Sequence, residues 1–297
     1  MRMTNNMLSQ NLLRNLESAQ GRMDQLQNQI SSGHRINRPS DDPVGIQNAM
    51  RLKSNISSVE QWKSNADEAL SYMNTTDSTL GEITSMLQRV KELAVQGANG
   101  TVTTEDKGTI AAEVDQISDH LKMLANTQIG SKYIFSGTAT DKKLEISSNG
   151  TVSQGNDQYV EFEVGNNLRI PISVKGQDLF GAATTPTGGI FTTLSELSEA
   201  LKSGDLAGIN KGLANVDKNI DNVITVRSGL GARTNRMTAL QEQLDYTSTN
   251  LQQNLSGIQD ADIAVTITEF TNSQNVYKAA LSVGAKIIQP SLVDFMR

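Results

Sequence analysis

Apolar residues recur at alternating spacings of four and three residues at both ends of the chain. Near the N-terminus the pattern occupies Leu12, Leu16, Ala19, Met23, Leu26 and Ile30. Near the C-terminus it occupies Ile263, Ile267, Phe270, Gln274, Tyr277, Leu281, Gly284 and Ile288. This is the pattern of a coiled-coil stripe, so each end is predicted to form a helix with one apolar face. Two such stripes are most simply covered by pairing with each other or with a neighbouring chain.

Long helices are also predicted in the middle of the chain. Gly33 stops the first helix, and Asp42 followed by Pro43 is a capping residue before a residue suited to the first helical turn. Apolar spacing then continues without proline to about Gly97, and a third, antiparallel helix is expected over 110–124. Helical spacing returns over 194–258. Three charged residues interrupt the stripe of the long second helix: Lys63, Asp77 and Lys91.

Between these helices the period of the pattern changes to two. Apolar residues alternate with polar ones over 160–164 and again over 168–174, which predicts a β-hairpin with one apolar face. In that register Glu163 faces Arg169 across the two strands. Pro171 lacks an amide hydrogen, so its strand is expected at an edge. The turn type is left open because its first residue is glycine.

Together these patterns predict a mainly α, elongated protein with an inserted β domain. Helical layers built from both chain ends are expected to be nested. The expected domains are a terminal coiled-coil domain, a helical bundle and a β-rich insertion. Their predicted boundaries are 1–43 with 262–297, 44–132 with 192–261, and 133–191.

Composition disfavours most familiar catalytic and metal-binding chemistry. The 297 residues include no Cys and two His, so disulfides, thiolate zinc sites and His-rich sites lack their residues, and we expect no cofactor. A net charge of -6 offers no basic excess for a phosphate backbone, so no nucleic-acid partner is expected. No stretch approaches 18 apolar residues, which argues against membrane insertion. His120 with Asp115 and Asp119 could suggest acid–base or metal chemistry, but a neutral role on a solvated helix face is favoured.

The terminal stripes bury few side chains for the number of residues that must be ordered. Backbone ordering costs ~1 to 2 kcal/mol per residue, so the ends need contacts beyond their own pairing. We therefore expect both ends to be disordered in the free monomer and to become ordered on assembly.

Two motifs at opposite ends of the chain carry a family resemblance. The stretch 30–45, ISSGHRINRPSDDPVG, resembles the N-terminal signature of the bacterial flagellin superfamily, and its RPSDDP form is similar to the hook-associated members. The stretches 258–264 and 291–295 resemble the C-terminal helix of that superfamily, and 230–233, LGAR, fits the core before it. The β insertion adds almost nothing to the resemblance. Pro290 departs from it, where a continuing helix is expected.

This resemblance implies a secreted structural protein of the extracellular bacterial flagellum, not an enzyme. Such a protein is exported by the flagellar type III apparatus and placed at the hook–filament junction. Its terminal helices would line an inner tube, the next helices an outer tube, and the β domain would face the medium. The implied partners are hook-associated protein 1, flagellin and a cytoplasmic export chaperone, with self-association in a ring.

The resemblance also assigns candidate interaction residues. The terminal interface would use Leu12, Leu16, Met23, Leu26, Ile30, Ile263, Ile267, Phe270, Tyr277, Leu281 and Ile288. The signature loop and helix cap would use Arg35, Asn37, Arg38, Asp41, Asp42 and Pro43. Three alternatives stay open: a flagellin filament subunit, a cytosolic coiled-coil scaffold, and an enzyme that relies on His120.

Overall fold

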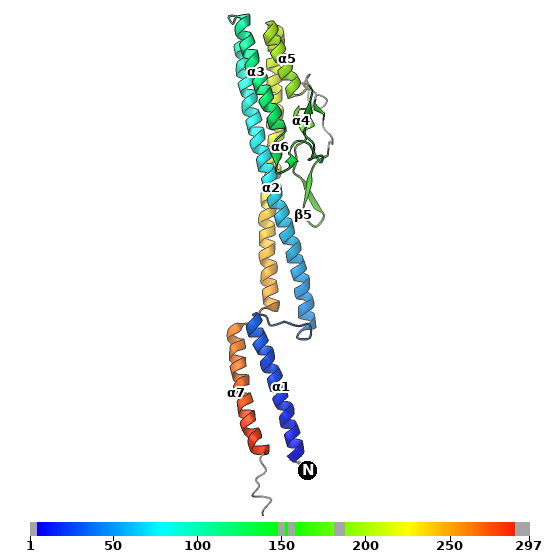
Figure 1. The fold of residues 1–297 in the computed structure, drawn as a ribbon, viewed down its shortest axis with the longest axis vertical. Helices are drawn as coiled ribbons and strands as arrows, with labels where there is room; N and C mark the ends of the chain where they lie inside the picture. Colours follow the sequence, from blue (N-terminus) through cyan, green and yellow to red (C-terminus); the bar gives the residue numbers. More distant parts are fainter. Residues whose placement is uncertain (1–4, 148–151, 154–157, 181–187, 289–297) are drawn as a thin grey trace, which may run out of the picture. The chain divides into compact units, whose positions relative to one another are not determined.

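The structure is a computed structural model that describes residues 5–147, 152–153, 158–180 and 188–288. Helices dominate it, and the strands are short and confined to one region in the middle of the sequence (Figure 1). In chain order the elements are α1 (Asn5–Ser32), α2 (Pro43–Ala98), α3 (Thr104–Ala125), β1 (Gln128–Ile129), β2 (Lys132–Tyr133), β3 (Glu145–Ile146), β4 (Val152–Ser153), β5 (Glu161–Gly165), β6 (Leu168–Pro171), α4 (Gly176–Phe180), α5 (Ile190–Ser203), α6 (Leu206–Gln259) and α7 (Ile263–Ile288). The predicted fold class, mainly α with an inserted β region, is confirmed.

The chain forms two compact units. The first contains the described residues up to Ser58 and from Thr247 onward, and the second contains those between Val59 and Tyr246. The β region lies within the second unit and shares its hydrophobic core with the helices, and the three-domain division stays a prediction. The ring of Phe180 on α4 packs edge-on against Phe135 and stacks on Phe191 of α5, with centroids 5.5 and 5.3 Å apart.

Local signals explain where the first helices begin and end. Gly33 has a φ of 74° and its amide donates to the Gln29 carbonyl, which closes the last turn of α1. Asp42 accepts a 2.8 Å hydrogen bond from the Gly45 amide, and α2 begins at Pro43 as expected. The predicted interruption between these helices is therefore confirmed. No described helix is long and apolar enough to cross a membrane.

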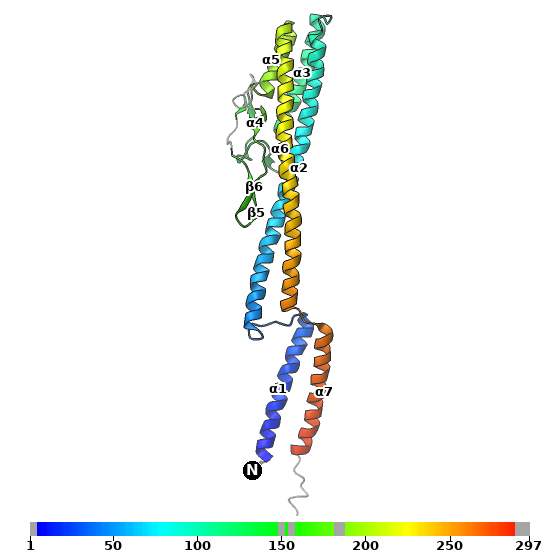
Figure 2. The ribbon, with the colours of Figure 1, turned by 180° about the vertical axis from the view of Figure 1, so that it is seen from behind.

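The core of the second unit is organised around α2 and α6, which lie side by side in both views (Figures 1 and 2). Their buried residues include two apolar rows with sevenfold spacing. The row on α2 is Val59, Ala66, Met73, Leu80, Leu87 and Ala94. The row on α6 is Ile209, Val216, Val223, Leu230, Met237 and Leu244. Helical spacing over 194–258 becomes two helices in the structure, α5 and the 54-residue α6.

The predicted hairpin is the pair β5 and β6. Glu163 faces Arg169 in the antiparallel register, and their side chains form a 3.6 Å ion pair. Asn167 takes the left-handed φ of 59° in the turn, and the register shifts between Glu163 and Gly165. Two helices hold the hairpin region: Asn65 of α2 donates to the Glu163 carbonyl at 2.8 Å, and Arg233 of α6 donates to the Ser173 carbonyl at 3.2 Å.

Candidate assembly surface at the chain ends

Helices α1 and α7 pack side by side and antiparallel within the first unit (Figures 1 and 2). Among the described side chains of α1, Leu26 is the most deeply buried apolar one, at 6% exposed. Near the other end of the pair, Gly284 of α7 is buried against Leu12, and a Cβ at this position would lie 2.6 Å from Leu12 Cδ2. Glycine therefore permits close approach of the two helices at that point.

The predicted interface residues divide into two groups in the single chain. On α1, Leu26 is buried, and the other four are half-buried: Leu12, Leu16, Met23 and Ile30. On α7, Phe270 and Tyr277 are half-buried, whereas the aliphatic residues are exposed: Ile263 at 40%, Ile267 at 47% and Leu281 at 45%. The side chain of Ile288 lies outside the described part of the chain. Pairing with α1 thus covers only part of the α7 stripe.

A second apolar stripe runs along the opposite face of α7. Val265, Val276 and Val283 are spaced by eleven and seven residues, which returns to the same helix face, and each is more than half exposed. Only Glu269, Lys278 and Lys286 carry charge on α7. A helix with apolar residues on opposite faces is typical of an element enclosed by neighbours.

A groove between α1 and α7 lies along the first α7 stripe, which contributes Phe270, Tyr277 and Leu281 to its lining. It has a cavity volume of about 470 Å³ and an amphipathic lining. Met23, Phe270 and Leu281 supply apolar surface, and Gln20 and Gln274 supply polar surface. The groove can accept a side chain row of similar mixed character from another helix.

Residues 33–35, which follow α1, are hydrogen-bonded to residues 258–261, which precede α7. We call these two segments the clasp. The Arg35 amide donates to the Gln259 carbonyl at 2.7 Å, and the Ala261 amide donates to the Gly33 carbonyl at 2.9 Å, on either side of an antiparallel bridge between His34 and Asp260.

Side chains add to the clasp. The Arg35 guanidinium donates to the Ile258 carbonyl at 2.9 Å, and His34 Nδ1 lies 3.0 Å from Asp260 Oδ1. Hydrogen bonding from Ser256, with a further contribution from His34, lowers the pKa of the Asp260 carboxyl. The clasp therefore connects the segment after α1 to the segment before α7.

The signature loop between the clasp and α2 is held by its own carboxylates. One Asp41 oxygen accepts the amides of Asn37 and Arg38, at 3.2 and 2.9 Å. The Asn37 side chain donates to the His34 carbonyl at 3.0 Å. Asp42 caps α2 at the Gly45 amide, and Pro43 is the first residue of that helix.

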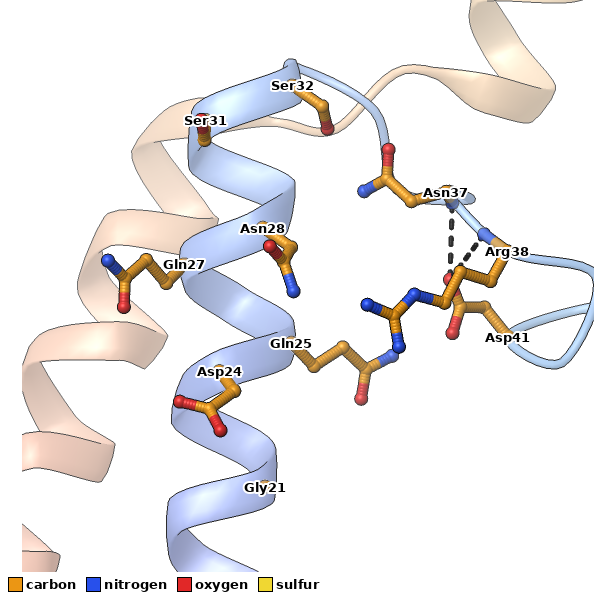
Figure 3. Close-up of a pocket in the computed structure, with 10 residues that line it drawn as sticks. All are labelled: Gly21, Asp24, Gln25, Gln27, Asn28, Ser31, Ser32, Asn37, Arg38 and Asp41. Atoms are coloured by element: carbon orange, nitrogen blue, oxygen red, sulfur yellow. Dashed lines mark hydrogen bonds between the residues drawn. The ribbon is translucent and has the colours of Figure 1, made fainter.

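A polar pocket of about 900 Å³ separates this loop from α1 (Figure 3). Asp24, Gln25 and Asn28 line it from the helix, and Asn37, Arg38 and Asp41 line it from the loop. In Figure 3 the Arg38 side chain extends toward Gln25, and Asp24 lies further along α1. The pocket presents both charges and several amides, a surface that suits a polar protein segment.

Sequence reasoning missed three members of this region. Gln29 donates to the Arg35 carbonyl at 2.9 Å, Ile36 is buried at 2% exposed, and Asp260 faces His34. An apolar residue between the polar neighbours Arg35 and Asn37 was a usable signal for Ile36. The partners His34 and Asp260 are 226 positions apart, and no local pattern connects them.

The candidate catalytic group around His120 does not form a site. His120 is exposed, Asp119 pairs with Lys122 at 2.9 Å, and Asp115 pairs with Lys202 at 2.8 Å. Among the described residues, no three His, Asp or Glu side chains gather as a metal ion would require.

Family models match both ends of the chain. The bacterial flagellin N-terminal helical region matches residues 3–140, and the bacterial flagellin C-terminal helical region matches residues 213–296. The clasp and both terminal helices fall within these matches, whereas 141–212 lies between them. The 291–295 motif and Pro290 lie outside the described residues.

Whole-length relatives and a solved structure agree with the family models. The chain is 29% identical to a flagellin of Bacillus subtilis, covering 97% of both chains, and 24% identical to flagellar hook-associated protein 3 of Escherichia coli, covering 94% of this chain and 95% of that one. A putative flagellar hook-associated protein from Vibrio parahaemolyticus has the same fold, with a TM-score of 0.67 at 19% identity, over 74% of this chain and 100% of that chain. This chain belongs to the bacterial flagellin family.

Proposed function

We propose that this protein is a structural adapter subunit at the hook–filament junction of the bacterial flagellum, corresponding to hook-associated protein 3. Proteins of its family are structural components of the extracellular flagellum. The observation that carries the proposal is the uncovered apolar surface of α7. In this role the chain has no reaction to catalyse, and its interfaces are its functional sites.

The surface of α7 explains why the chain ends would associate with other subunits. Among the described side chains of this helix, six large aliphatic ones are at least 40% exposed: Ile263, Val265, Ile267, Val276, Leu281 and Val283. Burying such a side chain is favourable by ~1.5 to 3 kcal/mol, and exposed apolar rows on a helix mark interaction sites. Neighbouring copies in a ring would cover both α7 stripes, and the groove beside α1 would receive one of their helices.

An adapter must bind two different neighbours, and the relatives support this reading. Hook-associated protein 3 of Escherichia coli aligns along nearly the whole chain, and a solved hook-associated protein shares the fold. We therefore propose hook-associated protein 1 as the partner on the hook side and flagellin as the partner on the filament side. The flagellar type III apparatus would export the chain, and a cytoplasmic chaperone would cover the α7 stripes before export.

A filament subunit is the second candidate. The Bacillus subtilis flagellin is 29% identical over 97% of the chain, which exceeds the identity to the hook-associated relative. Polymerisation separates the two candidates. A purified filament subunit extends into long filaments when seeded, whereas an adapter stays monomeric or stops at one ring. Negative-stain microscopy of the purified protein would show which behaviour holds.

Deleting the chain ends tests the proposed interface in the bacterium that carries the protein. Loss of residues 1–30 or 270–297 should abolish attachment to the hook and retention of the filament. Protection of the helices of the 59–246 unit, measured by amide exchange on the purified protein, should remain. Export is scored separately from the culture medium, and a tag added at the N-terminus of the full chain controls for altered ends. Normal filament retention by either exported deletion variant would reject the proposal.

A further inference from the structure

The apolar rows of α2 and α6 leave their axial alignment weakly determined. Both rows repeat every seven residues and contain no polar side chain, from Val59 to Ala94 on α2 and from Ile209 to Leu244 on α6. Sliding one helix by seven residues, about 10 Å, would again place apolar residues opposite apolar residues. Side-chain sizes differ along the rows, but the rows themselves contain nothing polar that would distinguish one alignment from another. Another feature must select one alignment.

The three charged residues that interrupt the α2 stripe form ion pairs with residues of α6. Lys63 lies 2.5 Å from Asp245, and Lys91 lies 2.7 Å from Asp217. Between them, Asp77 accepts two hydrogen bonds from Arg227, at 2.8 and 3.0 Å. The α2 members are spaced by fourteen residues, so they lie on one side of the helix pair. We call these three pairs the ion-pair ladder.

The ladder has an alternating order of charge. From Lys63 to Lys91, α2 presents plus, minus, plus, and α6 presents the complementary order. A slip of seven residues in one direction would place Thr238, Ile220 and Asn210 opposite the three α2 charges. A slip in the other direction would place Gln252, Thr234 and Ile224 opposite them. Either slip therefore removes all three charge pairs.

We propose that the ion-pair ladder selects the axial register of α2 against α6. All six side chains are half-exposed, so each pair contributes little to stability, but the set discriminates between alignments that the apolar rows accept. The register matters because the β region contacts both helices: Tyr72 donates to the Ile134 carbonyl at 2.8 Å, and Arg233 donates to the Ser173 carbonyl. A slip would separate these attachment points.

The absence of cysteine from the sequence allows a direct measurement of register. Gln88→Cys and Glu242→Cys place spin labels at two exposed positions that are far apart along the helix pair. A slip of seven residues changes their separation by about 10 Å. The double electron–electron resonance signal of the labelled full chain should show one narrow distance distribution.

Charge reversal on α2 is the decisive variant. Lys63→Glu, Asp77→Lys and Lys91→Glu together should broaden the distribution or add a population displaced by about 10 Å. Adding Asp245→Lys, Arg227→Glu and Asp217→Lys should restore the single narrow distance. Reversing Arg89, which pairs with Glu113 of α3, is the matched control and should leave the α2–α6 distance unchanged.

A variant with neutral substitutions keeps the test decisive if the charge-reversed chain does not fold. Lys63→Gln, Asp77→Asn and Lys91→Gln remove the attraction without introducing repulsion, and the distribution should still broaden. A single unshifted distance in the folded reversed chain would overturn the proposal, because the β region alone would then fix the register. If the charge-reversed chain does not fold, a single unshifted distance in the neutral variant would overturn the proposal.

Discussion

The ionisation of the Tyr72 phenol on α2 depends on the packing of the second unit. Its ring is buried, and its hydroxyl donates to the Ile134 carbonyl at 2.8 Å. Burial raises the pKa of Tyr72 to about 12. Since the neutral phenol is the form that the folded chain favours, the stabilisation is complete below the ordinary pKa of about 10 and is lost as pH rises toward 12.

Ultraviolet titration of the phenols provides the measurement for Tyr72. We expect one late ionisation step in the folded chain that is absent in Tyr72→Phe and in the chain unfolded by urea. The variant should also lose ~1 to 3 kcal/mol of unfolding free energy, because the Ile134 carbonyl loses its donor. An unchanged late step in Tyr72→Phe would assign it to another tyrosine.

The second residue-scale prediction concerns the Asp77 carboxylate. Its hydrogen bonds with Arg227 lower its pKa. A depressed pKa contributes stability that is present above the unfolded value of about 3.9 and is lost as pH falls through the folded value. Asp77→Asn should therefore cost ~0.2 to 1 kcal/mol at pH 7, and the difference should vanish in acid.

Denaturant unfolding of the full chain between pH 2 and pH 7 checks the prediction for Asp77. Glu82→Gln, an exposed change on the same helix, is the control and should show little difference at any pH. A difference between wild type and Asp77→Asn that stays constant down to pH 2 would contradict the account.

At the residue scale, sequence predicts contacts between near neighbours. The Asp42 cap and the Glu163–Arg169 pair follow from local spacing and from strand alternation. The contact of His34 with Asp260 depends on how distant segments meet, and no periodicity encodes that.

At the element scale, the sevenfold spacing predicts most helices, because burial of one stripe fixes both the element and its inward face. The separate β domain stays a prediction, and in the structure the β region packs against the helices of the second unit. The rings of Phe135, Phe180 and Phe191 join the β region to α5, and such contacts depend on tertiary packing that alternation in the strands does not reveal.

Gly284 provides a prediction about the pairing of α1 with α7. Gly284→Leu would push against Leu12, and overpacking of this kind costs ~1 to 3 kcal/mol. Amide exchange should accelerate over 12–30 and 263–285 but not over 59–246. The control is Gly257→Leu, where a Cβ meets nothing within 4 Å. Equal exchange in Gly284→Leu and wild type would show that the helices do not depend on close approach there.

At the scale of the whole molecule, sequence identifies the family and the structure identifies the surface through which a member could assemble. The motif at 30–45 forms one segment of the clasp and the capped loop, and the C-terminal stripe forms a helix that α1 covers only in part. The order of the chain ends in the free monomer stays a prediction. The neighbour that each face binds stays a proposal.

Localisation on the flagellum tests the junction assignment most directly. Immunogold electron microscopy of intact flagella, with antibodies against the 59–246 unit, would locate the protein. A strain lacking the gene supplies the background. We predict gold confined to a short zone between hook and filament. Gold along the length of the filament would contradict the adapter role and identify a filament subunit.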